Sequence, residues 1–450
     1  MKIVKKLGSL DKGSLAGWAQ QLCTASSALL LLPVFVRCLG QAQSGLWLTF
    51  QTVVGVAGLA DFGISYVAAR QAAYALGRQQ GRGFSGACDI DGAIIGTEGV
   101  RETLRLARIA NVISCSFGAL VLFVSLRFAR FDDSAGLSPS EVSCVVGLLG
   151  GTVLIRLWGR PFASILDGTG SLHLTRLIGA GQQVFMSVGA ALIVLYGGGL
   201  VVVGCWAVVT SVVEYVMFRI IYRKRIGLVP KLGFNVGDFG GLLKLVKVAY
   251  PLGLVSVGGY LVNSIQLPFI AAALGPEKVA PYYVAQRIGQ FANMTILQLV
   301  LPKLPEFTRL LGMGNRSAAA VLFRRSAIQV SILSIFGALV FCVMLPTVSL
   351  HYFKVQPLPP LAIVIMSFDL LLLNSTVVLG HYVLASGQNP FWRWTLVAGI
   401  INFTILYFSL ASVGIVAIPV ATVLAGVATT YWASIYHGRK LWVRLNEGIV

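Results

Sequence analysis

The sequence has very little charge. Only 11% of its 450 residues are Asp, Glu, Lys or Arg, whereas soluble domains carry roughly a quarter. Hydrophobic residues make up 56% of the chain, and its mean hydropathy is +0.82. A chain of this composition cannot cover a soluble fold with polar side chains, which excludes a soluble enzyme and indicates an integral membrane protein.

The sequence also lacks the motifs that mark enzymes and metal sites. No G-x-x-x-x-G-K-[ST] segment occurs, which excludes ATP hydrolysis at a P-loop. The seven cysteines stand singly, mostly inside apolar runs, and we interpret them as packing residues. Asp89 to Gly92 resembles the beginning of a calcium loop, but Val100 stands where that loop needs its final Glu. We therefore expect no metal, no cofactor and no catalytic residue.

Apolar runs long enough to cross a bilayer of about 30 Å recur along the whole chain. Backbone groups in lipid must be satisfied internally, so these runs are expected to be helices. The sequence predicts an all-α polytopic membrane protein with about twelve spans, divided into lobes at 1–228 and 229–450. The predicted helices are 14–38, 43–69, 104–127, 142–165, 171–197, 200–222, 245–273, 279–305, 326–350, 358–387, 390–411 and 413–437.

Acidic residues are scarce, and the basic residues are unevenly placed. Of the 35 Lys and Arg residues, 27 lie in or beside alternate connecting segments that include both termini. The opposite side has five: Arg37, Arg127, Arg130, Lys278 and Lys354. The positive-inside rule then predicts that both termini are cytoplasmic. The net charge of +19 is mostly a topology signal, so we expect no nucleic-acid partner.

A repeat relates the two predicted lobes. A shift of 235 positions aligns Leu32-Pro33 with Leu267-Pro268, Leu39-Gly40 with Leu274-Gly275, Trp47 with Tyr282, and Gln51 with Gln286. Because six is an even number of helices, both copies of the repeat enter the membrane in the same direction. The two copies are then related by an axis along the membrane normal. This predicts two six-helix lobes around a central cavity that is exposed alternately to each side of the membrane.

Two regions of the chain resemble bacterial Wzx-type oligosaccharide flippases, which are polysaccharide transporters of the multidrug/oligosaccharidyl-lipid/polysaccharide (MOP) exporter superfamily. The first comprises Leu32 to Gly40, Gly45 to Trp47, Gly58 to Gly63 and Ala68 to Arg70. The second comprises Ala273 to Pro276 and Val279 to Ile288. The resemblance implies a multi-pass protein of the bacterial inner membrane that carries a polyprenyl-diphosphate-linked oligosaccharide. Membrane lipid, a coupling H⁺ or Na⁺ and other polysaccharide assembly proteins are the further partners it implies.

Three arginines inside predicted spans are candidates for binding the substrate diphosphate. Arg156 and Arg160 lie four residues apart and therefore share one face of their helix. Arg287 lies in the second lobe. A guanidinium can bind phosphate oxygens in a bidentate manner, so Arg156 and Arg287 would grip the diphosphate from opposite lobes. The alternative is that an arginine such as Arg160 only extends to the cytoplasmic interface.

Two acidic residues in predicted spans are candidates for ion coupling. Asp369 lies near the middle of its span, where it either binds the coupling ion or neutralises an arginine. Asp61 lies nearer the cytoplasmic end, where it serves transport chemistry, helix packing or a gate. We interpret Glu214 as a structural polar group.

Three rival functions remain open at the level of the sequence. A drug or cation exporter of the same superfamily would more often expose acidic and aromatic residues to its cavity, whereas arginines outnumber acidic residues in the predicted spans here. A lipid II flippase is the second rival, and the sequence alone distinguishes it poorly from an oligosaccharide flippase. A membrane polysaccharide polymerase would be an enzyme with a large outward loop, and the longest outward segment here is short.

Overall fold

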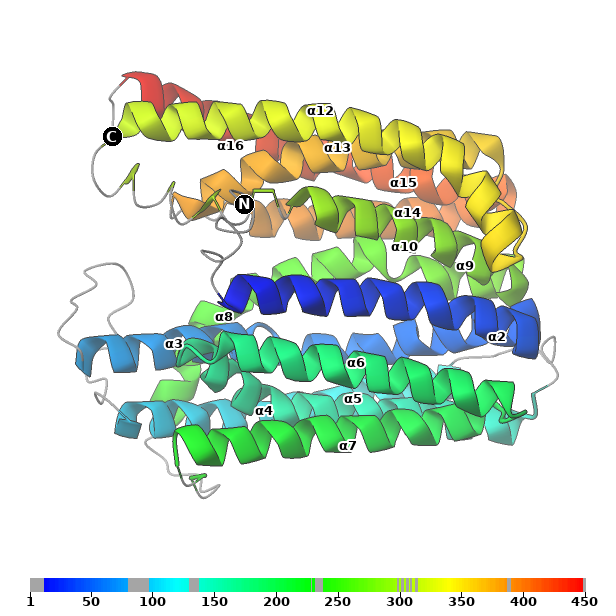
Figure 1. Cartoon of the computed structure of the whole chain (residues 1–450), viewed down its shortest axis with the longest axis horizontal. Helices are drawn as coiled ribbons and strands as arrows, with labels where there is room; N and C mark the ends of the chain where they lie inside the picture. The colour runs from blue at the N-terminus through cyan, green and yellow to red at the C-terminus, as the bar shows by residue number, and fades with distance from the viewer. Residues whose placement is uncertain are drawn as a thin grey trace, which may run out of the picture. The chain divides into compact units, whose positions relative to one another are not determined.

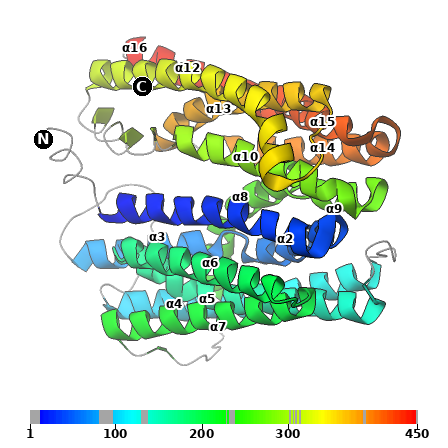
Figure 2. The ribbon, with the colours of Figure 1, turned by 45° about the vertical axis from the view of Figure 1, so that its right-hand side comes forward.

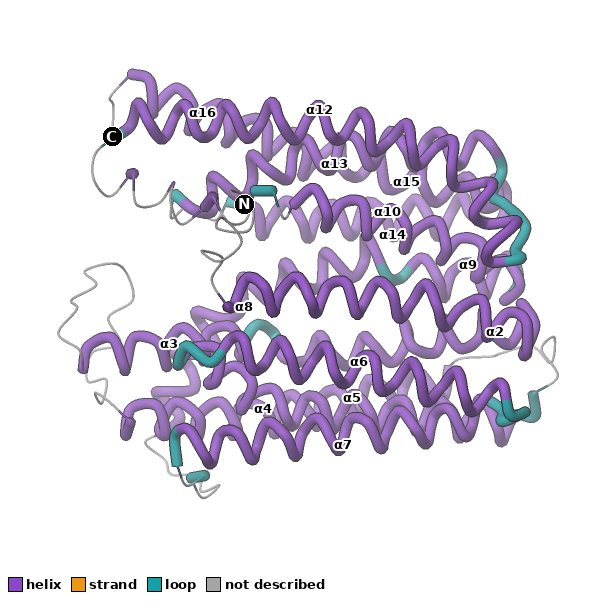
Figure 3. The backbone as a smooth tube through the Cα atoms, in the orientation of Figure 1, coloured by secondary structure: helices purple, strands orange, loops and turns teal. Residues whose placement is uncertain are grey.

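The computed structural model describes residues 12–79, 97–128, 137–227, 229–230, 238–297, 315–386 and 390–447, together with 299–300, 303–304, 307 and 310–311. All regular structure in these residues is helical (Figure 3). The predicted all-α class is therefore confirmed. Where the structure describes them, the twelve predicted segments lie mainly on helices, some on one helix and others across several successive helical elements.

The chain divides into two compact units, which we call unit 1 and unit 2. Unit 1 is Met1–Val34 with Phe50–Ser256, and unit 2 is Phe35–Thr49 with Val257–Val450. These units differ from the predicted lobes 1–228 and 229–450 in two segments. Phe35–Thr49 belongs to unit 2, and residues 229–256 belong to unit 1. The division into six-helix lobes at residue 228 remains a prediction.

Unit 1 is a bundle of long helices that lie side by side (Figures 1 and 2). Its helices are α3 (Ile64–Gln79), α4 (Thr97–Phe128), α5 (Pro139–Gly168), α6 (Leu172–Leu195) and α7 (Leu200–Arg225), with parts of α2 (Lys12–Gly58) and α8 (Asp238–Asn263). Helix α5 begins with a capping box, in which Ser138 and Glu141 satisfy each other's backbone N–H groups. Side chains of α3, α4, α5 and α7 form the core around Phe162 and Tyr222.

Among the described residues, unit 2 contains the Phe35–Thr49 part of α2, the end of α8 and seven further α-helices. They are α9 (Gln266–Leu274), α10 (Val279–Leu297), α12 (Arg316–Val348), α13 (Pro360–Ala385), α14 (Phe391–Val413), α15 (Ala417–Gly426) and α16 (Trp432–Glu447). The ring of Tyr382 on α13 meets Phe307 and Phe323 edge to face, and these residues belong to the core of the unit.

Apolar side chains cover the outside of these helices as well as the core. On α12, Ile332, Phe336 and Leu339 are all more than 60% exposed. Seven helical stretches of the described residues are long and apolar enough to span a membrane, or eight if the bent pair Leu30–Asp61 and Ile64–Ala73 counts as one span. One of the seven, Phe391–Asn446, contains both α14 and the α15–α16 run. The chain is thus a polytopic membrane protein, and the count of twelve spans remains a prediction.

The sequence repeat has a counterpart in the backbone. Gly40 interrupts α2 with φ 83° and ψ 169°, and Gly275, its partner in the repeat, ends α9 with φ 94° and ψ 151°. Only glycine adopts such positive φ values without strain. The aligned Trp47 and Tyr282 are both buried. Matching glycines and matching buried rings indicate that the repeat is structural.

Candidate functional site

The two arginines of α5 lie in unit 1, and each has one acidic partner among the described residues. Arg156 donates from Nε to the hydroxyl of Ser211 on α7 at 3.1 Å. The same Nε lies 3.5 Å from Oε2 of Glu214, and the Arg156 side chain is 41% exposed. This Oε2 atom is buried without a hydrogen-bond partner, and the interpretation of Glu214 as a structural polar group remains a prediction.

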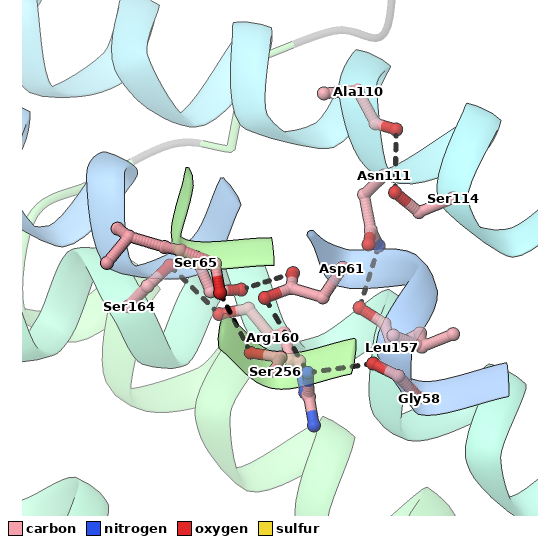
Figure 4. Close-up of polar contacts among 11 residues, drawn as sticks. Gly58, Asp61, Ser65, Ala110, Asn111, Ser114, Leu157, Arg160, Ser164 and Ser256 are labelled. Atoms are coloured by element: carbon pink, nitrogen blue, oxygen red, sulfur yellow. Dashed lines mark hydrogen bonds and ion pairs between the residues drawn. The ribbon is translucent and has the colours of Figure 1, made fainter. Parts of the chain in front are cut away.

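Helix α5 carries a proline beside Arg160. Pro161 has no N–H to donate to the carbonyl of Leu157, one helical turn before it. Asn111 on α4 fills this vacancy, since its side-chain amide donates to the Leu157 carbonyl at 2.7 Å (Figure 4). The Leu157 carbonyl therefore keeps a hydrogen bond, and the α5 segment bearing Arg156 and Arg160 is fixed against α4.

Arg160 and Asp61, assigned from the sequence to separate roles, are partners. Nη1 of Arg160 lies 3.6 Å from Oδ2 of Asp61, and it donates to the carbonyl of Gly58 at 3.4 Å (Figure 4). The other carboxylate oxygen of Asp61 accepts a hydrogen bond from Ser65 at 2.7 Å. Arg160 thus contacts both the end of α2 and the 3₁₀ turn Leu59–Asp61 that follows it. Sequence reasoning missed this pair because the two residues are far apart in the chain.

The segment that carries Asp61 is a sharp break in the helical path. Leu59–Asp61 form a 3₁₀ turn, after which Phe62 adopts a left-handed conformation with φ 42°. A left-handed conformation costs a non-glycine residue roughly 1–2 kcal/mol. Helix α8 passes close to this point, because a Cβ added at Gly253 would lie 2.4 Å from the Phe62 ring. The break is therefore held by packing as well as by Arg160, and local strain of this kind clusters at functional sites.

Arg287 lies on α10 in unit 2. Its Nη1 donates to the side-chain carbonyl of Gln290 at 3.0 Å. Its guanidinium carbon stands 4.7 Å from the centre of the Tyr283 ring, in a cation–π contact. The Nε atom is buried without a hydrogen-bond partner. Arg287 therefore retains donor capacity inside its unit.

Asp369 lies on α13 and lines a small cavity of about 110 Å³ within unit 2. Its Oδ1 accepts a hydrogen bond from the Tyr431 hydroxyl at 2.6 Å. Among the described residues no arginine forms an ion pair with Asp369. A tyrosine occupies one carboxylate oxygen of Asp369, the other residues that line the cavity are uncharged, and the role of Asp369 in ion coupling remains a prediction.

The other polar walls of this cavity include amide side chains at the break between α8 and α9 and on α10. The amide nitrogen of Gln266 donates to the carbonyl of Val262 at 2.6 Å and to the Thr422 hydroxyl at 3.0 Å. The Tyr282 hydroxyl donates to the Gln266 amide oxygen, and the Gln286 amide donates to the carbonyl of Asn263. Sequence reasoning missed this network, although amide residues inside apolar spans were the visible signal. A carboxylate with amide and hydroxyl oxygens is a donor set that suits a small hard cation.

The predicted site residues thus fall into two groups. Arg156, Arg160 and Asp61 lie in unit 1, whereas Arg287 and Asp369 lie in unit 2. The clamp formed jointly by Arg156 and Arg287 remains a prediction.

No protein-family model matches this chain, and no curated protein matches it in sequence. Solved structures match nearly its whole length. The lipid II flippase MurJ in an inward closed conformation has a TM-score of 0.65 and 11% identity, covering 97% of this chain and 90% of its own. A mutant of the MATE transporter VcmN from Vibrio cholerae has a TM-score of 0.62 and 16% identity, covering 96% of this chain and 97% of its own.

A third match is the inward-facing form of a multidrug resistance MATE family transporter of the MOP superfamily. Its TM-score is 0.61 and its identity 15%, covering 97% of this chain and 96% of its own. Similarity at these identities establishes the fold, while the narrower resemblance to Wzx-type flippases remains a prediction. The chain is therefore a polytopic membrane protein with the fold of MOP superfamily transporters.

Proposed function

We propose that this chain moves polyprenyl-diphosphate-linked oligosaccharides from the cytoplasmic to the periplasmic leaflet of a bacterial inner membrane. The product would supply the synthesis of O-antigen, capsule or exopolysaccharide. The observation that carries the proposal is that two arginines on one face of α5 are partly exposed and only loosely paired with acidic residues. Arg156 and Arg160 are 41% and 47% exposed, and their acidic partners stand 3.5 and 3.6 Å away.

These distances leave room for a stronger anionic ligand. Charge-assisted hydrogen bonds between nitrogen and a carboxylate are typically about 2.7–2.9 Å long. A diphosphate offers more oxygens and more charge than Glu214 or Asp61, and it can be bound by the planar guanidinium fork. Arg287 supplies a third cation with an unused Nε. In this proposal Arg156 and Arg287 bind the diphosphate, and Arg160 assists from the helix break.

Asp369 supplies the coupling step of the proposal. Its carboxylate has one oxygen engaged by Tyr431, and the adjoining cavity has amide and hydroxyl oxygens. A proton or a sodium ion bound there would change the charge of the site and bias the alternation of the transporter.

A drug or cation exporter is the second candidate, favoured by the same acidic cavity. The two candidates differ in substrate charge, since arginines attract anions and repel cations. Reconstituted protein should be assayed with a polyprenyl-diphosphate oligosaccharide, with lipid II and with a cationic dye. We expect transport of the first, and in cells depleted of the protein we expect the lipid-linked oligosaccharide to accumulate on the cytoplasmic leaflet. Transport of the dye alone would favour the exporter, and transport of lipid II alone would favour a peptidoglycan precursor flippase.

A further inference from the structure

One end of unit 2 contains a cavity that the proposed transport function does not use. Its volume is about 710 Å³, within the range of about 300–1,000 Å³ that is typical of small-molecule sites. Its walls come from the end of α9, the start of α10, the last turns of α12, the first turn of α13 and the turn after α14. Figure 1 shows these helix ends gathered at one end of the unit. Helix ends of a membrane protein lie near the lipid headgroups, which places the cavity at that depth.

The walls of the cavity are apolar and stiff. Most lining side chains are hydrocarbon, and five are prolines: Pro281, Pro346, Pro357, Pro359 and Pro360. Proline fixes its own φ angle, so these walls lose little conformational freedom when a ligand enters. Ile363 on α13 forms part of the wall and is 3% exposed. Such a cavity suits a hydrocarbon chain and offers it few hydrogen-bond donors.

One lysine gives the cavity a polar end. Lys278 is the only charged residue among those that line it, and Gln356 is the only amide. The neighbouring Glu277 does not line the cavity, because its carboxylate turns back beside Gly275. The lining also includes the first turn of α13, where the helix dipole is positive. An anionic group at one end of an apolar chain therefore complements the cavity.

The backbone next to the cavity departs from regular helix. After α12, residues Ser349–Phe353 form a π-helical turn, and Lys354 adopts a left-handed conformation with φ 57°. The side-chain amide of Gln41 donates to the Lys354 carbonyl at 3.4 Å. Single π turns and left-handed residues of this kind occur preferentially at functional sites. These irregular residues lead directly into Gln356 and the proline run of the cavity wall.

We propose that this cavity binds one anionic phospholipid, with an acyl chain between the prolines and Ile363 and the phosphate at Lys278. The site is independent of the transported substrate. It would anchor an annular lipid to the ends of five helices of unit 2 at once.

Two pairs of variants test the proposal by native mass spectrometry of protein taken from vesicles of phosphatidylglycerol and phosphatidylcholine. Lys278→Gln removes the cavity cation, and its control Lys354→Gln removes a lysine that does not line the cavity. Val364→Trp fills the cavity, and its control Leu361→Trp alters the same helix outside it. Val364 and Leu361 are 54% and 60% exposed, so a larger side chain at either position does not displace the core of unit 2.

We expect the unmodified protein and both controls to retain one more phosphatidylglycerol than Lys278→Gln or Val364→Trp, and to prefer it to phosphatidylcholine. Thermal unfolding of each variant verifies that the bundle is intact. Equal lipid retention by all folded variants would overturn the proposal, and so would equal retention of the two lipids. Displacement of the lipid by inorganic phosphate alone would also overturn it, since the site would then recognise an anion without its chain.

Discussion

The side-chain amide of Asn111 on α4 donates a 2.7 Å hydrogen bond to the carbonyl of Leu157 on α5. That carbonyl is the one that Pro161 leaves without its helical donor. A proline in one helix and an asparagine in another therefore act together, and the asparagine fixes the segment of α5 that carries both candidate substrate arginines.

The first prediction concerns this contact. Asn111→Leu should lower the free energy of unfolding by about 1–2 kcal/mol, because it leaves a buried carbonyl without a donor. Asn402 makes the same kind of bond to the carbonyl of Leu261 at 2.8 Å, so Asn402→Leu should behave alike in unit 2. Thermal unfolding in detergent measures both. The double variant Asn111→Leu with Pro161→Ala should recover most of the loss, and a failure to recover would show that the carbonyl is not the cause.

The second prediction concerns Asp61 and Arg160. A double-mutant cycle with Asp61→Asn and Arg160→Gln should give a coupling energy of about 1 kcal/mol or less, because the Arg160 side chain is 47% exposed. Both single variants should loosen the helix break, visible as faster hydrogen exchange at residues 62–66. Additive effects on stability, with no change in exchange, would mean that the ion pair does not hold the break.

The third prediction concerns the substrate clamp. Arg156→Gln and Arg287→Gln should each reduce transport at least tenfold per correctly inserted molecule, because Gln keeps bulk and donors but loses the charge. Lys should restore only part of it, since an ammonium cannot reproduce the planar fork. Arginines that only extend to the interface would be replaced equally well by Lys. Near-normal transport by both Gln variants would show that the cavity recognises its substrate in another way.

The fourth prediction concerns ion coupling. Asp369→Asn should abolish gradient-driven transport while leaving the protein inserted and able to bind substrate. Tyr431→Phe is the companion variant, because it removes the hydrogen bond that the Tyr431 hydroxyl donates to that carboxylate. It should shift the ion dependence without abolishing transport. Transport by Asp369→Asn that still responds to both proton and sodium gradients would remove this residue from the mechanism.

The fifth prediction concerns topology. Reporter fusions after Arg225 and after Arg325 should both report the cytoplasm, and a fusion near Lys354 should report the opposite side, because basic residues concentrate on the cytoplasmic side. A reporter after Arg225 that is active outside the cytoplasm would reverse the orientation.

The sequence by itself determined which segments are helices. Apolar runs in a lipid solvent have no alternative to helix, and Pro161 removes one specific hydrogen bond whatever its neighbours are. The alignment of Gly40 with Gly275 in the repeat also came from the sequence. In the structure both glycines adopt a positive φ, a backbone conformation that favours glycine.

Only the tertiary structure decided the partners of the buried polar groups. Arg160 meets Asp61, Asp369 meets Tyr431, and the amides of Gln266 and Gln286 satisfy the broken end of α8. In a chain that is apolar all around most of its helices, hydropathy does not specify which helix faces meet. Those pairings depend on close packing between segments that are distant in sequence, and only the folded bundle brings them within hydrogen-bonding distance.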